Sequence, residues 1–518
     1  MSDPGKPGRP AAPAEPDEET SEGFREAAVL AARRESLERL RSAGVDPFAL
    51  SFPKDTSAAD IRAEFDGRLA DGEESDRRAA VAGRVVLARR HGKLTFLVIR
   101  DGTGDLQLFC EEATLGNAYA LLDEIDLGDI VGATGVVVRT RRGELSLKVD
   151  TISILTKALR PLPEKWHGLK DPDLQQRRRY LHLIADETPR RYLLARAAVL
   201  KRIRAVLDDR GFVEFEGPML QQIAGGANAR PFTTFHNVLD TDMKLRISLE
   251  LYLKRMLVGG VERIFEIGRN FRNEGIDRDH NPEFTMLEAY QAYGDYGTMM
   301  ELSETLVSES ARAVAPIMGR DPDQLTVPFR GREIDLTPPF RRITVLGSVA
   351  EAVGEPVSFD RPDLRELASR HGVHLENAWG PGKVIQELFD KLVEPTIEQP
   401  TFVCDFPREV SPLARPHRDD PELTEHFDLV AGGLELVTAF SELTDPDEQR
   451  AKFEQQQAAK AAGDEEAHPL DEEFLTALEH GMPPAGGLGL GIDRLLMLLT
   501  DAPSLRDLIM FPSQRPER

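Results

Sequence analysis

Cysteine, tryptophan and long apolar runs are scarce in this chain. It has two cysteines, Cys110 and Cys404, and two tryptophans among 518 residues. The cysteines lie far apart without metal-ligand spacing, so a disulfide-rich secreted protein is not expected and both thiols are predicted to be packing residues in a reducing cytoplasm. No apolar run approaches the length that crosses a bilayer, and the N-terminus has no apolar core of a signal peptide. We therefore expect no membrane association.

An excess of basic charge is also missing. Lysine and arginine number 65 against 89 aspartates and glutamates, giving a formal net charge of -24. This balance argues against nonspecific binding of polyanions, but local basic clusters leave selective contact with RNA open. A hydrophobic content of 41% is ordinary for a soluble globular protein, and the length allows two or three domains.

The first third of the chain changes character twice. Residues 1–23, rich in Pro, Glu, Ala and Gly, are expected to form a disordered tail. Residues 24–43 have leucines at helical spacing and predict an amphipathic helix. Residues 80–155 then read as five short strands separated by Gly or Asp turns, which indicates a small barrel. The OB-fold is the usual five-stranded barrel that binds oligonucleotides, so residues 24–155 are assigned to one helix-plus-barrel domain.

The remainder predicts a linker and a mixed α+β domain. Prolines in residues 156–184 predict a stiff, extended linker. From residue 185 to 518 helices and strands alternate, beginning with a helix over 187–210 that ends at Gly211, a typical C-cap glycine. A strand over 212–215 ends at Pro218. Residues 345–400 are expected to form a mainly helical insertion, and the polar residues 446–473 a loop or lid.

The sequence Phe271-Arg272-Asn273-Glu274 and the segment that follows it carry the strongest local signal. Strand periodicity puts Arg272 and Glu274 on one face. The same period puts a set of aromatic and acidic residues on one face of a return strand, namely Phe284, Met286, Glu288 and Tyr290. A lone Arg-x-Glu is usually a surface ion pair, but this in-phase set predicts the wall of a binding site.

A second signal lies near the C-terminus, at Gly486-Gly487-Leu488-Gly489-Leu490-Gly491-Ile492-Asp493-Arg494. It predicts a glycine-rich β-to-α turn, in which the glycines let a ligand approach the backbone and the following helix directs its positive end at phosphate. Such a turn alone is weak evidence. Together with the Arg272 segment it predicts a nucleotide site.

These two segments resemble motifs 2 and 3 of the class II aminoacyl-tRNA synthetases, and the helix, strand and Pro218 before them resemble motif 1. The similarity covers roughly residues 24–518, and its distinctive stretches resemble the bacterial lysyl-tRNA synthetase family. Those stretches are Leu159 to Gly168, Gly225 to Phe232, Glu250 to Arg255, Glu409 to Arg415 and Phe440 to Leu443. The resemblance implies an antiparallel sheet flanked by helices behind an OB-fold barrel, and a homodimer built at motif 1.

The resemblance also implies how ATP is held. Arg272 grips the α-phosphate and the amino acid carboxylate, and Glu274 and His280 border the nucleotide. Phe284 stacks on adenine, while Arg494 covers the opposite face and reaches the γ-phosphate. The close-approach positions are Gly489 and Gly491, and the catalytic pair is Arg272 and Arg494, a choice consistent with the planar fork of a guanidinium.

Magnesium is the implied cofactor, bound with ATP through carboxylates. Asp428 and Glu435 align with the family's acidic pair, with Asp428 in place of an expected Glu. Simple alternation puts Glu435 on the face opposite Thr438, so we expect a β-bulge seeded by Gly432-Gly433 to re-phase the strand.

Three carboxylates, Glu250, Glu288 and Glu442, would repel an acidic substrate and suit an amino acid with two ammonium groups. By resemblance, Glu250, Glu288 and the backbone of Gly226 surround the α-amino end of lysine. Glu442 and Tyr290 meet the ε-ammonium, and Phe440 lines the aliphatic stem. The chain departs from the family pattern at Thr438, where Asn is common near the substrate carboxylate, and at Leu249 and Gly217.

The barrel is implied to read the U-rich anticodon of tRNA(Lys). Phe96 aligns with the aromatic on which a base stacks, and Arg89, Gln107 and Glu144 align with the groups that bond base edges.

The implied activity joins L-lysine and ATP into lysyl-adenylate and pyrophosphate, and then transfers lysine to the 3′ end of tRNA(Lys). Two alternatives stay open. The first is a lysyltransferase acting on a lipid or protein, which the lack of spanning helices and the presence of a barrel disfavour. The second is a catalytically impaired, synthetase-like RNA-binding protein, which the intact Arg272, Glu274, Phe284 and Arg494 disfavour and Thr438 leaves open.

Overall fold

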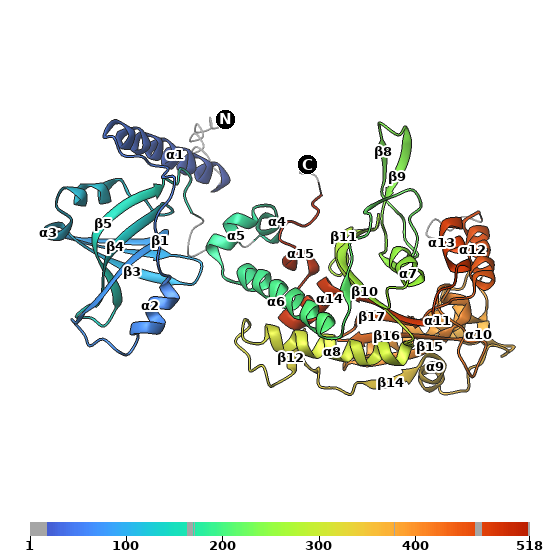
Figure 1. The fold of residues 1–518 in the computed structure, drawn as a ribbon. Helices are drawn as coiled ribbons and strands as arrows, with labels where there is room; N and C mark the ends of the chain where they lie inside the picture. Colours follow the sequence, from blue (N-terminus) through green and yellow to red (C-terminus); the bar gives the residue numbers. More distant parts are fainter. Residues whose placement is uncertain (1–17, 163–168, 170, 378, 462–468, 516–518) are drawn as a thin grey trace, which may run out of the picture. The chain divides into compact units, whose positions relative to one another are not determined.

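The chain divides into two compact units, Met1–Gly168 and Leu169–Arg518 (Figure 1). The computed structural model describes residues 18–162, 169, 171–377, 379–461 and 469–515. Most of the expected disordered tail, residues 1–17, lies outside the described residues. Among the helices of the described part, none is both long and apolar enough to cross a bilayer.

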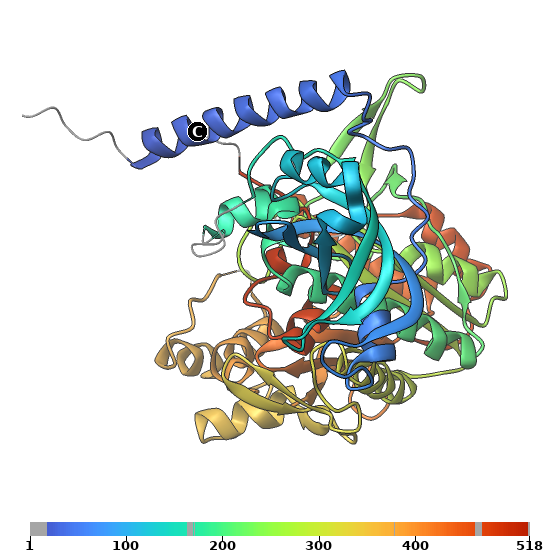
Figure 2. The ribbon, with the colours of Figure 1, turned by 90° about the vertical axis from the view of Figure 1, so that its left-hand side faces the viewer.

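The first unit is the predicted five-stranded barrel, closed in the order β1-β2-β3-β5-β4 (Figure 2). Its strands are β1 (Glu74–His91), β2 (Leu94–Arg100), β3 (Asp105–Glu111), β4 (Ile130–Arg139) and β5 (Leu145–Thr156). Only β3 and β5 pair in parallel. Alternate side chains, such as Leu97 and Ile99 of β2, fill the barrel core, while the residues between them face outward. The strands β3 and β4 are joined by α3 (Glu112–Leu115) and η1 (Gly116–Glu124).

A long helix, α1 (Glu18–Ser42), lies against the barrel and is the dark blue helix of Figure 2. It begins six residues earlier than expected, at Glu18 rather than residue 24. Arg33 anchors it, because its guanidinium donates to the carbonyl oxygens of Leu127, Ala158 and Arg160 at 2.8–2.9 Å. A short helix, α2 (Ala58–Phe65), is capped by the Ser57 side chain.

The expectation of an extended linker over residues 156–184 is wrong from Pro172 onward. The chain forms α4 (Pro172–Arg177) and α5 (Arg179–Ala185) there. The reason is local: the Asp171 side chain caps the Asp173 amide, and Pro172 occupies the first helical position, which it favours. The guanidinium of buried Arg179 then donates to the carbonyl oxygens of Arg506, in α15 (Leu505–Leu508), and of Met510, and so fixes α5 to the C-terminal segment of the same unit.

The second unit is built on an eight-stranded sheet of order β14-β15-β16-β17-β18-β11-β10-β6, which confirms the predicted α+β class. Its strands are β6 (Val213–Glu214), β10 (Arg263–Phe271), β11 (Glu283–Ala292), β14 (Arg341–Thr344), β15 (Thr401–Pro407), β16 (Leu423–Ala431), β17 (Leu434–Ser441) and β18 (Ala485–Gly491). Only the outermost pairs, β14 with β15 and β10 with β6, are parallel. β6 is half the length expected for the strand over 212–215.

One face of the central strands packs against helices and the other is left for a ligand. The helices are α6 (Thr188–Asp209), α8 (Tyr296–Val314) and α14 (Ile492–Thr500). The sheet residues that pack against them are Leu287, Ala289, Val437, Ala439, Leu488 and Leu490. Because side chains alternate, the residues between these face the opposite side. Helix α6 ends as predicted, with Gly211 at a φ of 78° and its amide bonded to Asp208.

The expectation of a glycine-rich turn at residues 486–491 is wrong, because this segment is the central strand β18. It pairs along its length with β11 and β17. The alternation of Gly with Leu is the period-two pattern of a strand with one apolar face, since Leu488 and Leu490 are buried in the core. The turn to α14 comes only after Gly491.

The other elements surround this sheet. They are the small sheet of β7 (Leu220–Gln221), β8 (Thr233–His236) and β9 (Thr241–Leu245), the pair β12 (Thr326–Phe329) and β13 (Arg332–Asp335), helix α7 (Glu250–Val258), and the short η2 (Glu394–Thr396) and η3 (Arg408–Val410). The predicted helical insertion consists of α9 (Val345–Val353), α10 (Leu364–Arg370) and α11 (Pro381–Leu392), which share a core of their own.

The expected loop or lid over residues 446–473 is wrong for the described residues. They form α12 (Pro446–Ala461) and the start of α13 (Glu472–Glu479). The Asp445 side chain accepts from the amides of Asp447 and Glu448, which starts α12, and Phe453 of α12 is fully buried against Phe474 of α13.

Candidate active site

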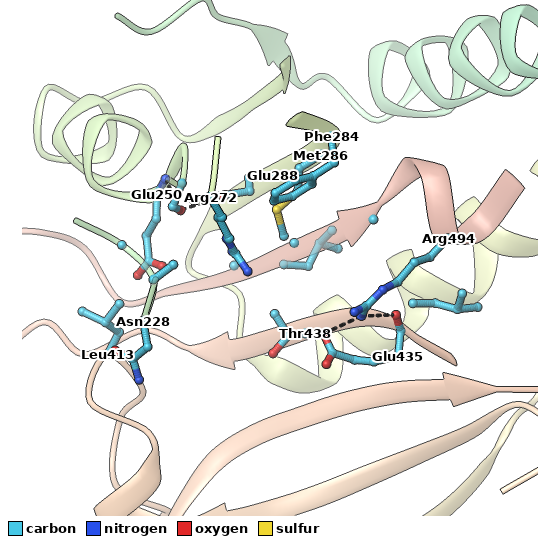
Figure 3. Close-up of a pocket in the computed structure, with 18 of the residues that line it drawn as sticks. Asn228, Glu250, Arg272, Phe284, Met286, Glu288, Leu413, Glu435, Thr438 and Arg494 are labelled. Carbon is cyan, nitrogen blue, oxygen red and sulfur yellow. Dashed lines mark hydrogen bonds and ion pairs between the residues drawn. The ribbon is translucent and has the colours of Figure 1, made fainter. Parts of the chain in front are cut away.

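A cavity of about 470 Å³ lies on the polar face of β11, β18 and β17 (Figure 3). It collects most of the predicted ATP and lysine residues from segments far apart in the chain. Those that line it are Gly226, Glu250, Arg272, Glu274, His280, Phe284, Glu288, Tyr290, Glu435, Thr438, Phe440, Gly489, Gly491 and Arg494. Asp428 and Glu442 are not among its lining residues.

Strand register explains why these side chains meet. Glu288, Gly489, Thr438 and Asp428 form one row across β11, β18, β17 and β16. Tyr290, Gly487, Phe440 and His426 form the next row. Side chains directly opposite in a sheet stand only ~5 Å apart. The glycines of β18 therefore leave the floor open between larger residues on either side.

Arg272 enters the cavity from just beyond the end of β10. The expectation that the strand continues through Glu274 is wrong, because β10 ends at Phe271 and the amide of Asn273 bonds the carbonyl of Arg230 instead, at 2.7 Å. The guanidinium lies 5.1 Å from the ring centroid of Phe284. Burial lowers the pKa of Arg272, but an arginine stays charged at any physiological pH. In Figure 3 its side chain extends toward the strand of Thr438 and Glu435.

Arg494 also borders the cavity, from the first turn of α14. It donates to the carbonyl oxygen of Glu435 at 3.0 Å and lies 3.7 Å from the carboxylate of that residue. Its second nitrogen lies 3.4 Å from Nε2 of His280. Two guanidinium groups thus border one cavity, an arrangement suited to a polyphosphate.

Asp493, beside Arg494, holds helix α14 in place by hydrogen bonds, a role that the sequence analysis missed. Its carboxylate accepts from Arg196 of α6 at 2.5 Å and from the amide of Thr285 on β11 at 2.7 Å. It therefore ties the helix that carries Arg494 to both the sheet and α6. A buried aspartate is recognisable from the sequence only when its distant partner is known.

The opposite end of the cavity is rich in buried carboxylates. Glu288 accepts from the Ser248 hydroxyl, the Leu249 amide and the Tyr290 hydroxyl at 2.8–3.0 Å. Burial, and then the charge of Glu250, raise the pKa of Glu288 to about 7. A raised pKa means that the ionised carboxylate of Glu288 is not fully neutralised by nearby cations. A cationic ligand would therefore stabilise it.

Lys254 is the one ammonium placed among these carboxylates in the described structure, and the sequence analysis missed it. Its Nζ lies 2.5 Å from Oε1 of Glu250 and 2.5 Å from Oε2 of Glu442, and its side chain is fully buried. Burial alone would lower the pKa of Lys254, but the charges of Glu250 and Glu442 raise it above the ordinary value. The spacing of Glu250 and Lys254, four residues apart on α7, is a signal that predicts such a pair.

Glu442 follows the end of β17 and is buried beside Gly487 of β18 and the Tyr290 ring. Burial raises its pKa in spite of Lys254, and neither carboxylate oxygen has a hydrogen bond of good geometry within the described residues. A Cβ placed on Gly487 would lie 2.1 Å from Oε1 of Glu442 and 2.4 Å from Tyr290. Only glycine therefore leaves room beside β18 for the Glu442 carboxylate and the Tyr290 ring, and the sequence analysis did not assign Gly487 this role.

The side chains of Asp428 and Glu435, the predicted metal ligands, lie on one face of the sheet as expected. The β-bulge that brings them there is not the one predicted at Gly432-Gly433. The register of β16 with β17 shifts so that Leu436 is an extra residue, which turns Glu435 to the face of Thr438. Gly432 and Gly433, with φ of 62° and 72°, form the hairpin turn instead. Enclosure in the cavity, and then the charge of Asp428, raise the pKa of Glu435, so the pair would gain from a divalent cation. Among the residues the structure describes, no group of three or more His, Cys, Asp or Glu side chains gathers as a metal cluster.

The predicted RNA-binding residues lie in the barrel unit on adjacent strands. Arg89 pairs in register with Phe96, and Phe96 with Phe109. The rings of Phe96 and Phe109 stack at 5.2 Å, so the aromatic surface is larger than predicted. Gln107 is buried, accepts from Arg89 and donates to Ser146, and thus positions Arg89. Glu144 is exposed in the turn before β5, 3.9 Å from Arg62.

Comparison with known proteins agrees with both units. Residues 171–515 match the family profile of class II tRNA synthetases (D, K and N), and residues 79–155 match the OB-fold nucleic acid binding domain. The chain is 48% identical to the lysine–tRNA ligase of Moorella thermoacetica over 95% of its own length and 99% of the relative. It is also 48% identical to the lysine–tRNA ligase of Synechococcus sp. CC9311, over 94% of the chain and 98% of the relative.

The sheet, its glycine strand and the two arginines define a class II synthetase fold with an OB-fold barrel. Within that class, the chain belongs to the lysine–tRNA ligase family.

Proposed function

We propose that this protein activates L-lysine with ATP at the described cavity and transfers the lysyl group to the 3′ end of tRNA(Lys). The observation that carries the proposal is one cavity with two guanidinium groups at its nucleotide end and three buried carboxylates at its other end. A site for ATP and an amino acid with two ammonium groups needs both.

In the first step, a carboxylate oxygen of lysine attacks the α-phosphorus of ATP, the bond to the bridging oxygen breaks, and pyrophosphate leaves with the electron pair. Arg272 neutralises charge at the reacting phosphate and orients the attacking carboxylate. Arg494 and His280 hold the far phosphates, and Phe284 supports the adenine together with Glu274. No side-chain nucleophile is needed, because alignment and fixed positive charge lower the barrier.

Lysine is selected by charge. Glu250 and Glu288 receive the α-ammonium near the backbone of Gly226, whose φ of 90° lets the chain turn close to Ser248. The stem runs along Phe440 and past Gly487, and the ε-ammonium reaches Tyr290 and Glu442. An amino acid with a neutral or acidic side chain would leave the buried carboxylates without a positive partner. The free-energy cost of these unpaired charges would exceed the gain from its other contacts.

Asp428 and Glu435 are the residues that would hold Mg²⁺ together with oxygens of ATP. Burial and the neighbouring charge of Asp428 raise the pKa of Glu435, and a pair of carboxylates in this situation fits a hard cation that prefers oxygen ligands. When bound, the ion supplies neutralisation of phosphate charge.

In the second step, a hydroxyl of the terminal ribose of tRNA attacks the lysyl carbonyl and AMP leaves. The barrel supplies the recognition: Phe96 offers a stacking surface, Arg89 and Glu144 offer polar groups for the anticodon, and buried Gln107 positions Arg89. A non-tRNA acceptor would make no use of this face. Both cysteines are buried and free, which suits a reducing cytoplasm.

A homodimer is proposed from the surface around α6 and β6. Apolar side chains exposed there include Leu194, Val213, Leu220, Phe235 and Val238. β6 ends the large sheet, and the β8–β9 hairpin extends away from it (Figure 1). Exposed apolar residues grouped on neighbouring elements mark an interaction surface, and a second copy would cover it symmetrically.

Arg272→Ala is expected to reduce lysine-dependent ATP–pyrophosphate exchange by about 10²- to 10³-fold, because the charge at the reacting phosphate loses its partner. Arg269→Ala is the matched control, since Arg269 lies three residues earlier, on β10, is half-exposed and pairs with Glu283. Exchange measured with and without EDTA tests the magnesium requirement in the same assay. Near-normal exchange by Arg272→Ala would refute the assignment.

Phe96→Ala is expected to raise the KM for tRNA(Lys) about tenfold while leaving pyrophosphate exchange unchanged, since loss of one base–aromatic stack costs ~1–3 kcal/mol. Aminoacylation of tRNA(Lys) transcripts measures this, and Phe48→Ala, another exposed aromatic of the same unit, serves as the control. Equal effects of the two variants would contradict the proposed RNA face.

Val213→Asp is expected to shift the protein from dimer to monomer in sedimentation velocity experiments, because a charge placed in a self-complementary contact is repeated by symmetry. Leu50→Asp, at an exposed apolar position of the barrel unit, is expected to leave the dimer intact. A monomeric wild-type protein would rule out the proposed interface.

A further inference from the structure

His426 lies on the wall of the cavity in a fixed orientation. Its ring stacks on Phe406, with centroids 3.9 Å apart and planes inclined by 24°, and meets Phe440 edge-on at 4.7 Å. The side chain is 11% exposed. Aromatic contacts on both sides therefore leave the ring one orientation and direct its two nitrogens to defined partners.

The two nitrogens of His426 join residues on three segments. Nδ1 lies 2.8 Å from the Ser411 hydroxyl, which is buried. Nε2 lies 3.2 Å from Oδ1 of Asp428 and 3.2 Å from Oγ1 of Thr438. Asp428 and Thr438 are the two positions at which this chain departs from the expected Glu and Asn, and both meet at the same nitrogen.

The direction of these hydrogen bonds follows from the acceptors. A carboxylate oxygen only accepts, so Nε2 carries a proton and donates toward Asp428 and Thr438 in either protonation state of the ring. Oγ1 of Thr438 is then an acceptor from His426, and its own proton must point elsewhere. Within the described residues the Thr438 hydroxyl has no second partner, and Thr438 lines the cavity.

We propose that His426 is a positioning residue that turns the Thr438 hydroxyl into a hydrogen-bond donor aimed at the carboxylate of the bound amino acid. The inference rests on the proposed function and on the family resemblance, which implies that the position of Thr438 lies near the substrate carboxylate. An asparagine amide carries its own donor, whereas a hydroxyl can donate or accept. Because His426 occupies the accepting side of the hydroxyl, Thr438 can perform the donor role that an amide would have.

A matched pair of amides tests which nitrogen matters. His426→Asn places an amide near the position of Nδ1 and within reach of Ser411, whereas His426→Gln places one near the position of Nε2 and within reach of Thr438. In pyrophosphate exchange at saturating Mg²⁺, we expect His426→Asn to raise the lysine KM about tenfold, the effect of one hydrogen bond to a charged group. We expect His426→Gln to stay within about threefold and the ATP KM to stay within about twofold in both.

A double-mutant cycle with Thr438→Val separates positioning from general disturbance. Thr438→Val should raise the lysine KM as much as His426→Asn, and the double variant should be no worse than either single variant, because both remove the same donor. Additive effects, equal effects of Asn and Gln, or an equal rise of the ATP KM would overturn the inference.

If the variants at position 426 fail to fold, Ser411→Ala provides the test, since it removes the partner that holds Nδ1. A raised lysine KM with an unchanged ATP KM would support the inference, and an unchanged lysine KM would overturn it. Absence of lysine-dependent exchange in the wild-type protein would overturn the proposed function and this inference with it. Normal wild-type exchange with an unchanged lysine KM in His426→Asn would overturn this inference alone.

Discussion

The buried ammonium of Lys254, shared by Glu250 and Glu442, is the interaction on which the amino acid end of the site depends. A carboxylate taken out of water is costly unless it is paired, and one lysine cannot fully pair three buried carboxylates. Ser248, Leu249 and Tyr290 satisfy Glu288 only by hydrogen bonds. The cavity therefore has an excess of negative charge, which fits the proposed ligand with two ammonium groups.

Strand β18, with its alternating glycines, leaves space in the cavity beside the buried carboxylates. β18 runs between β11 and β17, and its leucines hold the core while its glycines face the cavity. Large residues on either side, such as Glu288 opposite Gly489 and Tyr290 opposite Gly487, can then share one cavity. Arg494 follows directly after β18, in the first turn of α14. The segment from β18 to Arg494 therefore contributes to both the nucleotide end and the amino acid end of the cavity. Asp493 secures this segment to α6 and β11.

Sequence periodicity was sufficient to predict the barrel strands and the residues that share one face of β11. It was also sufficient to predict that a bulge must bring Glu435 to the face of Thr438. It failed where long-range pairing decides the structure. The glycines of β18 have turn composition, yet two neighbouring strands hold them in the sheet. Residues 446–461 are polar, yet a cap at Asp445 and one buried phenylalanine make them helical. Lys254 and His426 were missed because their roles depend on residues distant in the chain, although the i, i+4 spacing of Glu250 and Lys254 was a usable signal.

Lysine binding to Gly487→Ala, measured by isothermal titration beside the wild-type protein, tests the central claim most directly. An added methyl group would lie 2.1 Å from the Glu442 carboxylate and 2.4 Å from the Tyr290 ring, so both groups would have to move away from their present positions. The account predicts that lysine affinity falls by at least about tenfold, ~1.4 kcal/mol, while ATP affinity stays within about twofold. Lysine affinity equal to that of the wild-type protein would show that the ε-ammonium does not reach this carboxylate, and would contradict the account.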